Sequence, residues 1–312
     1  MENKTGKVIS VNISQKKGEI KLPVDKIVID EKGIKNDAHS GDWHRQVSLL
    51  DRHSIKSFEK ELGRSLKHGE FAENITTEGF TLYKMKLLDT LKINDVVLEI
   101  TQIGKKCHGD GCAIYNAVGK CVMPKEGIFC RVKSFGTISS GDKIIYSPKI
   151  FKTLIITLSD RASKGEYSDR SGPAIKKILN NFFDNNQYEH EISTKIIPDN
   201  AELLTKNINK ALENNFDIII TTGGTGIGKR DITIETIKPL LDKEISGIME
   251  MIRIKYGAEK PNALLSRSIA GIIRNTFVYS LPGSVKAVQE YMNEINKTLL
   301  HSVYMLHGLD AH

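Results

Sequence analysis

A glycine-rich segment, Thr221-Thr-Gly-Gly-Thr-Gly-Ile-Gly-Lys-Arg-Asp231, has the composition of a loop that binds an anion. Its glycines, at positions 223, 224, 226 and 228, lack Cβ atoms and permit positive φ, so several backbone N–H groups can converge on one ligand. Thr222 and Thr225 add hydroxyl donors. The spacing matches neither the Walker loop nor the G-x-G-x-x-G dinucleotide motif. A tight turn without a ligand is the alternative interpretation.

Three further polar clusters follow other apolar runs in the same half of the chain. They are Ser159-Asp160-Arg161, Pro198-Asp199-Asn200 and Pro282-Gly283-Ser284. Ligands of parallel α/β sheets bind beyond the carboxyl ends of the strands, so we expect these clusters and the glycine loop to meet at one edge. Two carboxylates, Asp199 and Asp231, would repel each other beside a phosphate unless Mg²⁺ lay between them. For each acidic residue taken singly, a helix cap is the alternative interpretation.

The elements that position these clusters alternate between strand and helix over residues 150–312. Apolar runs at 154–158, 192–197, 216–220 and 277–281 indicate buried strands. Between them, helices are expected from Ser171 with Ile175, Ile178, Leu179 and Phe182 facing inward, from Asn200 as a cap, and from Ile232 onward. This alternation predicts a three-layer, doubly wound α/β domain with a mostly parallel sheet.

Residues 1–149 have a different pattern and are expected to form a separate domain that ends near Ser147-Pro148. Short apolar or alternating runs at 7–13, 27–29, 47–50, 87–91 and 96–103 are separated by Gly, Asn and Asp, with one helix near 53–62. The pattern favours a β-barrel. The expected domain boundaries are therefore 1–149 and 150–312.

Composition narrows the class of protein. Residues 1–150 carry 25 Lys and Arg against 19 Asp and Glu, whereas residues 151–312 carry 20 against 19, so the basic excess lies in the first half. That balance suits an anionic ligand, with a solvated basic surface as the alternative. No basic stripe with interleaved aromatic residues suggests nucleic acid, and no signal-peptide or membrane-span pattern is found, so a cytoplasmic protein is expected.

All four cysteines, Cys107, Cys112, Cys121 and Cys130, lie in one short segment of the first half. In a chain without a secretory signal they are expected to be thiols, and their spacing does not match common structural zinc motifs.

Several stretches around these cysteines carry a family resemblance. They are 33–50, 69–79, 103–108 and 121–132, and together they resemble the molybdenum cofactor sulfurase C-terminal domain family, known as MOSC. The resemblance implies a β-barrel that binds the molybdenum cofactor or carries sulfur, with Cys107 as the working thiol. Asp37, His39, Arg45 and Asn74 match the polar pocket positions of the family. Turn or surface roles for these four residues, and Cys112 or Cys121 as the working thiol, are the alternatives.

The second half resembles the bacterial molybdopterin adenylyltransferase family over residues 151–312. The resemblance is carried by 155–173, Ile197-Pro-Asp-Asn200, the glycine loop, Leu264-Leu-Ser-Arg267 and Leu281-Pro-Gly-Ser284. It implies that the terminal phosphate of molybdopterin attacks the α-phosphate of ATP with Mg²⁺, which gives adenylylated molybdopterin and pyrophosphate. Ile227-Gly-Lys229 replaces the small, Pro-containing segment that is usual in the family.

The resemblance also implies roles for individual residues. Asp199 acts at the reacting centre, Asp231 positions the metal or the pterin, the loop amides and Thr225 hold phosphate, and Ser284 lies against the adenylate. The residues that it implies contact substrate or nucleotide are Asp160, Thr222, Gly223, Gly224, Thr225, Gly226, Ser266, Arg267, Pro282, Gly283 and Ser284.

Two other functions remain open at this point. The molybdenum insertase family shares the glycine loop, but the Ser-Asp-Arg-Ala-Ser stretch from Ser159 and the compact length argue against it. A pterin-binding or scaffold protein without catalysis is the second, and the presence of both Asp199 and Asp231 disfavours it. The family resemblance further suggests a homotrimer that passes its product to a molybdenum insertase.

A first prediction concerns Cys107. Lys105 and Lys106 precede it and His108 follows, and nearby cations favour the nucleophilic thiolate. A buried thiol packed like a small apolar side chain is the alternative. We expect Cys107→Ser to leave adenylylation unchanged and to abolish formation of a protein persulfide. Thiol labelling across pH in the four single Cys→Ser variants checks this. The assignment is wrong if the thiol that titrates earliest is Cys112 or Cys121.

Overall fold

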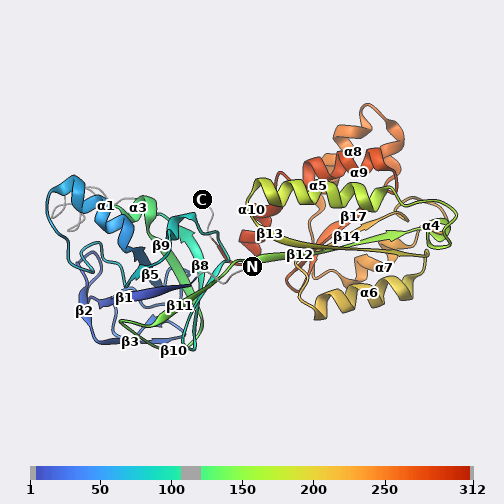
Figure 1. The fold of residues 1–312 in the computed structure, drawn as a ribbon. Coiled ribbons are helices and arrows are strands. Elements are labelled where there is room, and N and C mark those ends of the chain that lie inside the picture. Colours follow the sequence, from blue (N-terminus) through green and yellow to red (C-terminus); the bar gives the residue numbers. More distant parts are fainter. Residues whose placement is uncertain (1–4, 107–120, 310–312) are drawn as a thin grey trace. The chain divides into compact units, whose positions relative to one another are not determined.

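The computed structural model describes residues 5–106 and 121–309 and forms two compact units (Figure 1). The first unit comprises the residues up to Lys149 together with the C-terminal residues from Gly308, and the second runs from Ile150 to His307. None of the described helices has both the length and the apolar character that a membrane span requires.

The first unit is a closed β-barrel, as the sequence predicts. Strands β11, β7, β8, β9, β5, β6 and β1 follow one another around the sheet, and β1 pairs back onto β11. Strand β2 extends the sheet beside β1, and β10, β3 and β4 form a smaller sheet. The strands are β1 (Thr5–Ile13), β2 (Leu22–Val24), β3 (Lys26–Asp30), β4 (Gly33–Ile34), β5 (Val47–Asp51), β6 (Ile75–Glu78), β7 (Thr90–Ile93), β8 (Val96–Ile103), β9 (Ile128–Ser134), β10 (Gly136–Ser139) and β11 (Lys143–Ser147).

Alternating side chains fill the barrel. In β3, for example, Ile27 and Ile29 are buried and Val28 is exposed. Helix α1 (Arg52–Leu62) packs Ile55 and Phe58 into a second apolar cluster, and it begins where Asp51 Oδ1 accepts a hydrogen bond of 2.9 Å from Ser54 N. The short elements η1 (Leu82–Lys84) and α3 (Met123–Glu126) complete the unit.

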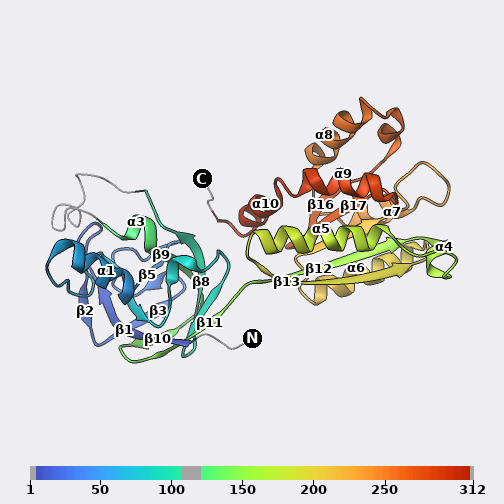
Figure 2. The ribbon, with the colours of Figure 1, turned by 45° about the horizontal axis from the view of Figure 1, so that its top comes forward.

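The second unit is a three-layer α/β domain, which confirms the expected fold class. Its sheet has the order β13-β12-β14-β17-β16-β15, in which the first four strands are parallel and the last two pair antiparallel. Helices α5, α8 and α9 lie on one face of this sheet, and α6 and α7 lie on the other (Figures 1 and 2). The strands are β12 (Ile150–Leu158), β13 (Glu189–Ile197), β14 (Ile218–Thr222), β15 (Lys243–Glu244), β16 (Ala270–Ile273) and β17 (Thr276–Leu281). The helices are α4 (Asp160–Ser163), α5 (Ser171–Asn185), α6 (Ala201–Glu213), α7 (Thr233–Ile237), η3 (Lys238–Leu240), α8 (Ser246–Gly257), η4 (Pro261–Leu265), α9 (Val285–Ile295) and α10 (Leu299–Leu306).

Three details differ from the sequence-based expectation. The strand before the glycine loop ends at Thr222 rather than at Ile220, because its threonines continue the ladder with β12 and β17. The helix after the loop is only α7, five residues long. On α5 it is Phe183 that is fully buried, since its ring stacks on Phe151 at 5.1 Å, whereas Phe182 is half-buried.

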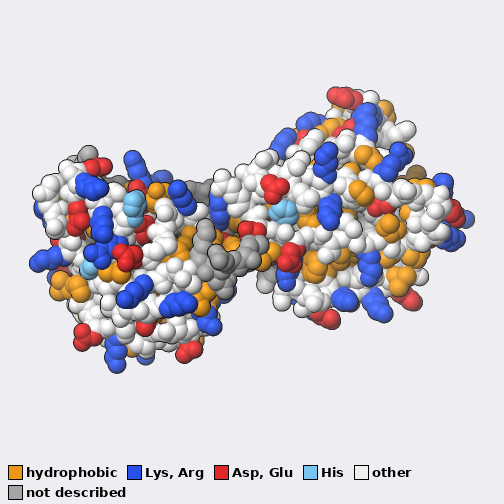
Figure 3. All heavy atoms as spheres, in the orientation of Figure 1, with side chains coloured by type: hydrophobic (Ala, Val, Ile, Leu, Met, Phe, Trp, Pro, Cys, Tyr) orange, Lys and Arg blue, Asp and Glu red, His pale blue; other side chains and the backbone are white. Residues whose placement is uncertain are grey.

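Lys and Arg side chains are interspersed with Asp and Glu on the face of the protein drawn in Figure 3.

A second prediction concerns Asn74, which is fully buried between β1 and β5. Its Oδ1 accepts hydrogen bonds from Ser48 N at 3.1 Å and Ser48 Oγ at 2.9 Å, and its Nδ2 donates to Asn12 O at 3.2 Å. Asn74→Ala removes these three buried hydrogen bonds, so we expect the barrel to lose about 1–3 kcal/mol of stability. Denaturant unfolding followed by the fluorescence of Trp43, the chain's single tryptophan, reports on the barrel alone.

Thr77→Val is the matched control, because Thr77 is also fully buried and its Oγ1 finds no partner among the described residues. We expect that variant to unfold at the wild-type denaturant concentration or above it. Equal midpoints for Asn74→Ala and wild type would contradict the prediction.

Candidate functional site

The four polar clusters of the second unit meet at one edge of the sheet. Strands β12, β13, β14 and β17 are parallel, so their carboxyl ends lie together. After β12 and β13, Asp160 N donates to Asp199 Oδ2 at 3.3 Å, and Asp199 N donates to Asp160 Oδ1 at 3.0 Å. After β14 and β17, Thr222 Oγ1 donates to Pro282 O at 2.8 Å. The expected convergence is therefore present in the structure.

Two glycines let the loop after β14 turn against neighbouring backbone. Gly223 has a φ of +98°, and a Cβ there would lie 2.4 Å from Leu158 O. Gly224 has a φ of +64°, and a Cβ there would lie 2.4 Å from Thr233 Oγ1, which in turn donates to Gly223 O at 2.8 Å. A side chain at position 223 would clash with the backbone of Leu158, and one at position 224 would displace the Thr233 hydroxyl, so glycine is favoured at both positions.

The loop then wraps the carboxylate of Asp231. Its Oδ2 accepts a hydrogen bond from Gly228 N at 2.7 Å, and Cβ atoms on Gly226 and Gly228 would lie 2.8 and 2.9 Å from the same oxygen. The absence of side chains at these positions thus fixes where the carboxylate lies.

Asp199 and Asp231 interact unfavourably with each other. Burial raises the pKa of Asp199, and the negative charge of Asp231 raises it further. The nearby Asp160 forms an ion pair with Arg230 of the glycine loop. Among the described residues no group of three or more His, Cys, Asp or Glu side chains forms a metal cage. Two repelling carboxylates without further protein ligands fit Mg²⁺, which commonly takes one or two carboxylates and completes its shell with phosphate oxygens and water.

Other predicted site residues hold the loop rather than face outward. Arg267 N donates to Thr225 O at 2.9 Å and Arg267 Nε donates to Gly226 O at 2.7 Å. Its guanidinium also pairs with Glu235 and donates to Asp231 O at 3.2 Å. Arg267 therefore acts on the site through the loop.

The hydroxyl groups are also largely engaged within the protein. Thr222 is fully buried in β14, and Thr225 is buried as well. Ser284 caps α9, because its Oγ accepts from Ala287 N at 3.2 Å, while the Oγ atoms of Ser266 and Ser268 lie 2.8 Å apart. Gly283 and Ser284 remain exposed at the edge of the sheet.

Sequence reasoning missed a group of residues that join α5 to this edge. Asp169 Oδ1 accepts from the backbone N–H groups of Ser171 and Gly172 at 2.9 and 3.1 Å, and its Oδ2 accepts from Thr157 Oγ1 at 2.8 Å. Ser171 Oγ donates to Gly283 O at 2.5 Å. An Asp two residues before the Ser-Gly-Pro that opens a helix can accept from the first helical N–H groups, and this signal could have identified Asp169.

The first unit contains a separate pocket of about 390 Å³. Of the four residues that match the family's pocket positions, His39, Arg45 and Asn74 line this pocket and Asp37 is buried. The sequence reasoning missed Lys17, Trp43 and Lys105, which share the lining with Gly18, Ser48, Ala72, Met123 and Phe129. The amide of Asn74 is engaged with Ser48 and Asn12, so its role there is structural.

The cysteines differ in their settings. Cys107 and Cys112 lie outside the described residues. Cys130 is fully buried, and its pKa is raised by burial and by the charge of Glu99, which disfavours a thiolate. Cys121 is half-buried against the apolar cluster beneath α1.

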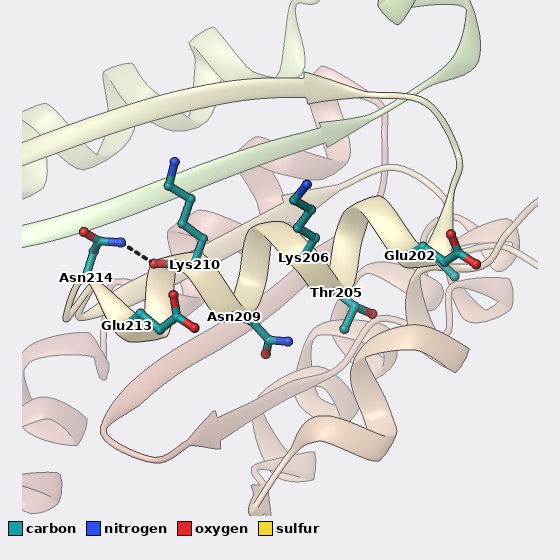
Figure 4. A pocket seen from close by; sticks show the side chains of 8 residues that line it. Glu202, Thr205, Lys206, Asn209, Lys210, Glu213 and Asn214 are labelled. Atoms are coloured by element: carbon teal, nitrogen blue, oxygen red, sulfur yellow. Dashed lines mark hydrogen bonds between the residues drawn. The ribbon is translucent and has the colours of Figure 1, made fainter.

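A broad hollow also lies over α6 (Figure 4). It is lined only by residues of that helix and by Asn214, and its lysines, Lys206 and Lys210, point to one side of the helix while Asn209 points to the other. A surface formed by one helix does not enclose a ligand, so this hollow is not a candidate site.

Comparison with known proteins identifies both units. A family model described as a probable molybdopterin binding domain matches residues 154–302, and the MOSC domain model matches residues 36–145. The fold and these matches define a two-domain protein of molybdenum cofactor biosynthesis.

The second unit has close relatives of known name. The molybdopterin adenylyltransferase of Pyrococcus furiosus is 42% identical over 160 residues, which cover 50% of this chain and 90% of that protein. Molybdenum cofactor biosynthesis protein B of Staphylococcus aureus is 37% identical over 163 residues, which cover 51% of this chain and 91% of that protein. The crystal structure of the tungsten cofactor synthesizing protein MoaB from Pyrococcus furiosus is 41% identical and covers 51% of this chain and 99% of that one, with a TM-score of 0.46. The chain belongs to the molybdopterin adenylyltransferase family, with an added MOSC domain.

A third prediction follows from the repulsion between Asp199 and Asp231. Because the folded state raises the pKa of Asp199, ionisation of this group opposes folding once the pH exceeds its ordinary value. Asp231→Asn keeps an oxygen for Gly228 N but removes the charge. We therefore expect Asp231→Asn to have a higher Tm than the wild type at neutral pH without divalent cations. The difference between the two Tm values should shrink as the pH falls and Asp199 becomes protonated.

Thermal unfolding of both proteins across pH, with Mg²⁺ removed by a chelator, measures this difference. Glu202→Gln serves as the control, since Glu202 is an exposed carboxylate in the first turn of α6. A lower Tm for Asp231→Asn at neutral pH would show that the carboxylates do not repel.

Proposed function

We propose that the second unit transfers the adenylyl group of ATP to the terminal phosphate of molybdopterin. A phosphate oxygen of molybdopterin forms the new bond to the α-phosphorus of ATP, and the bond to the β-phosphate oxygen breaks to release pyrophosphate. The observation that carries the proposal is the pair Asp199 and Asp231, held beside a glycine loop at the carboxyl edge of the sheet. The relative in Pyrococcus furiosus is named for this activity.

The site residues take separate parts in this reaction. Exposed backbone of the loop and the N–H groups near Gly283 receive phosphate oxygens, because unpaired amides favour anions. Asp199 and Asp231 would hold Mg²⁺, which when bound neutralises charge on the phosphates. Arg267 keeps the loop closed around Asp231, and Arg230 is a second positive group at the mouth of the site. Positioning and charge neutralisation are the main contributions of a protein to phosphoryl transfer.

We further propose that the protein acts as a homo-oligomer, as a trimer, that supplies a molybdenum insertase. Exposed apolar side chains gather on α8 and η4, where Met251, Ile254, Leu264 and Leu265 are each at least 50% exposed. An apolar surface of this kind is typical of a protein contact.

The barrel unit, residues 1–149 in this proposal, binds the pterin cofactor or carries sulfur. Its support is the pocket lined by His39, Arg45, Lys17 and Lys105, which suits a ligand with negative charge. The second unit, 150–312, then carries the adenylylation by itself.

A fourth prediction tests the adenylylation. Asp231→Asn preserves the shape of the side chain but removes the charge that the metal and phosphates require. We expect pyrophosphate release from ATP in the presence of molybdopterin to fall by at least about a hundredfold, as for other losses of transition-state charge stabilisation. The control is Asp217→Asn, because Asp217 precedes β14 at the opposite end of the strand.

Near-normal turnover by folded Asp231→Asn protein would contradict the assignment of Asp231. Absence of pyrophosphate release from the wild-type protein, with molybdopterin bound, would instead favour the non-catalytic pterin-binding protein.

A further inference from the structure

A lysine is fully buried beneath the barrel pocket. The side chain of Lys21 has no exposed area, and its Nζ lies 2.5 Å from Asp37 Oδ2, 3.4 Å from Ser14 Oγ and 3.2 Å from His39 Nδ1. Burial lowers the pKa of Lys21, while the hydrogen bond and charge of Asp37 oppose that effect. Burying an ammonium group costs free energy of folding unless polar or charged partners surround it. We therefore asked what Lys21 does for the residues around it.

Asp37 is the ionic partner of this lysine. Burial by itself would favour the neutral acid, but hydrogen bonds from Lys21 and from the backbone N–H of His39, together with the Lys21 charge, hold the pKa of Asp37 below its ordinary range. The carboxylate also accepts hydrogen bonds from Ser14 N at 3.1 Å and His39 N at 3.0 Å. The 2.5 Å separation of Lys21 Nζ from Asp37 Oδ2 is that of a charge-assisted hydrogen bond within an ion pair.

This pair determines how His39 can be protonated. Lys21 Nζ can only donate, so the His39 Nδ1 that faces it at 3.2 Å must accept. The other possible partner of Nδ1 is Asp37 Oδ1, but it lies 3.5 Å away and already accepts from the backbone of His39. The neutral ring thus carries its proton on Nε2.

The pocket above His39 has a positive lining. Lys17, Arg45 and Lys105 contribute to it, and none of the described residues that line it is acidic. Lys17 Nζ and the Arg45 guanidinium lie 5.5 and 4.8 Å from the ring centre of Trp43. Arg45 Nε is buried and has no hydrogen-bond partner within the described chain.

We propose that Lys21 is a positioning residue that holds the His39 ring with Nδ1 as an acceptor and Nε2–H as a donor, so that an acceptor atom of an anionic ligand binds against Nε2–H. His39 then donates a hydrogen bond in the pocket and does not act there as a general base. The identity of the ligand rests on the proposed role of the barrel, whereas the position of the proton on His39 does not. Neither of these depends on the adenylylation proposed for the second unit.

The protonation of His39 can be read directly in the full-length protein. After labelling histidines with ¹⁵N, long-range ¹H–¹⁵N correlation spectra separate a protonated ring nitrogen from a bare one. His39→Gln assigns the signals by their loss. At a pH where the ring is neutral we expect the proton on Nε2, and a proton on Nδ1 overturns the proposal.

Lys21→Met and Lys17→Met form a matched pair of variants. Lys17 lines the same pocket but makes no contact with His39 Nδ1. We expect Lys21→Met to move the proton to Nδ1, where Asp37 is then the nearest acceptor, and Lys17→Met to leave it on Nε2. An unchanged spectrum in folded Lys21→Met overturns the proposal. If that variant fails to fold, the wild-type spectrum still decides it.

Binding tests the donor role with inorganic phosphate as the probe. Trp43 is the chain's only tryptophan and lines the pocket, so its fluorescence reports this pocket alone. We expect saturable quenching that weakens roughly tenfold or more in His39→Leu, as for loss of a hydrogen bond to a charged group, and that is largely retained in His39→Gln, which keeps an N–H donor. The absence of saturable quenching, or equal affinity in His39→Leu, overturns the ligand assignment.

Discussion

The glycine loop after β14 passes close to the end of β12, and the geometry of the candidate site at this edge of the sheet depends on that contact. Gly223 passes so near to Leu158 O that any Cβ would clash, and its positive φ turns the chain toward Thr233. Only from this path can the following residues reach around Asp231 and accept the side chain of Arg267. The chemistry proposed for this edge is therefore a consequence of backbone packing.

In the barrel, a buried ion pair rather than close backbone packing supports the pocket. Parallel strands place loops at one edge of a sheet without special residues, whereas a barrel interior is apolar and must be adapted to hold a polar site. Here Lys21 and Asp37 bring ionic groups below the pocket, and Asn74 and Ser48 satisfy the neighbouring backbone. Both units thus hold polar groups in fixed positions. The α/β unit does so by close backbone packing, and the barrel does so by a buried ion pair.

The sequence predicts both fold classes because hydrophobic period and turn residues are local signals. The location of the glycine loop, Asp199 and Asp231 at one edge was also predictable, because the carboxyl ends of parallel strands lie at the same edge of a sheet. Lys21 was not, because a lysine among polar residues gives no sign that tertiary packing will bury it. The contacts of Arg267 and Thr222 were likewise hidden, since whether a polar side chain faces a ligand or a backbone carbonyl depends on distances across the fold. Trp43 and Lys17 join the pocket through the same long-range packing.

The repulsion between Asp199 and Asp231 has a consequence for the life of the protein in a cell. A site whose charges oppose each other when empty opens locally more often than the same site with its charges neutralised, and proteases act on locally opened chains. Ligand binding adds stability by mass action. Protein molecules with bound ligand would then be degraded more slowly than molecules without it. The amount of this protein would rise and fall with the concentration of its ligands, at a constant rate of synthesis.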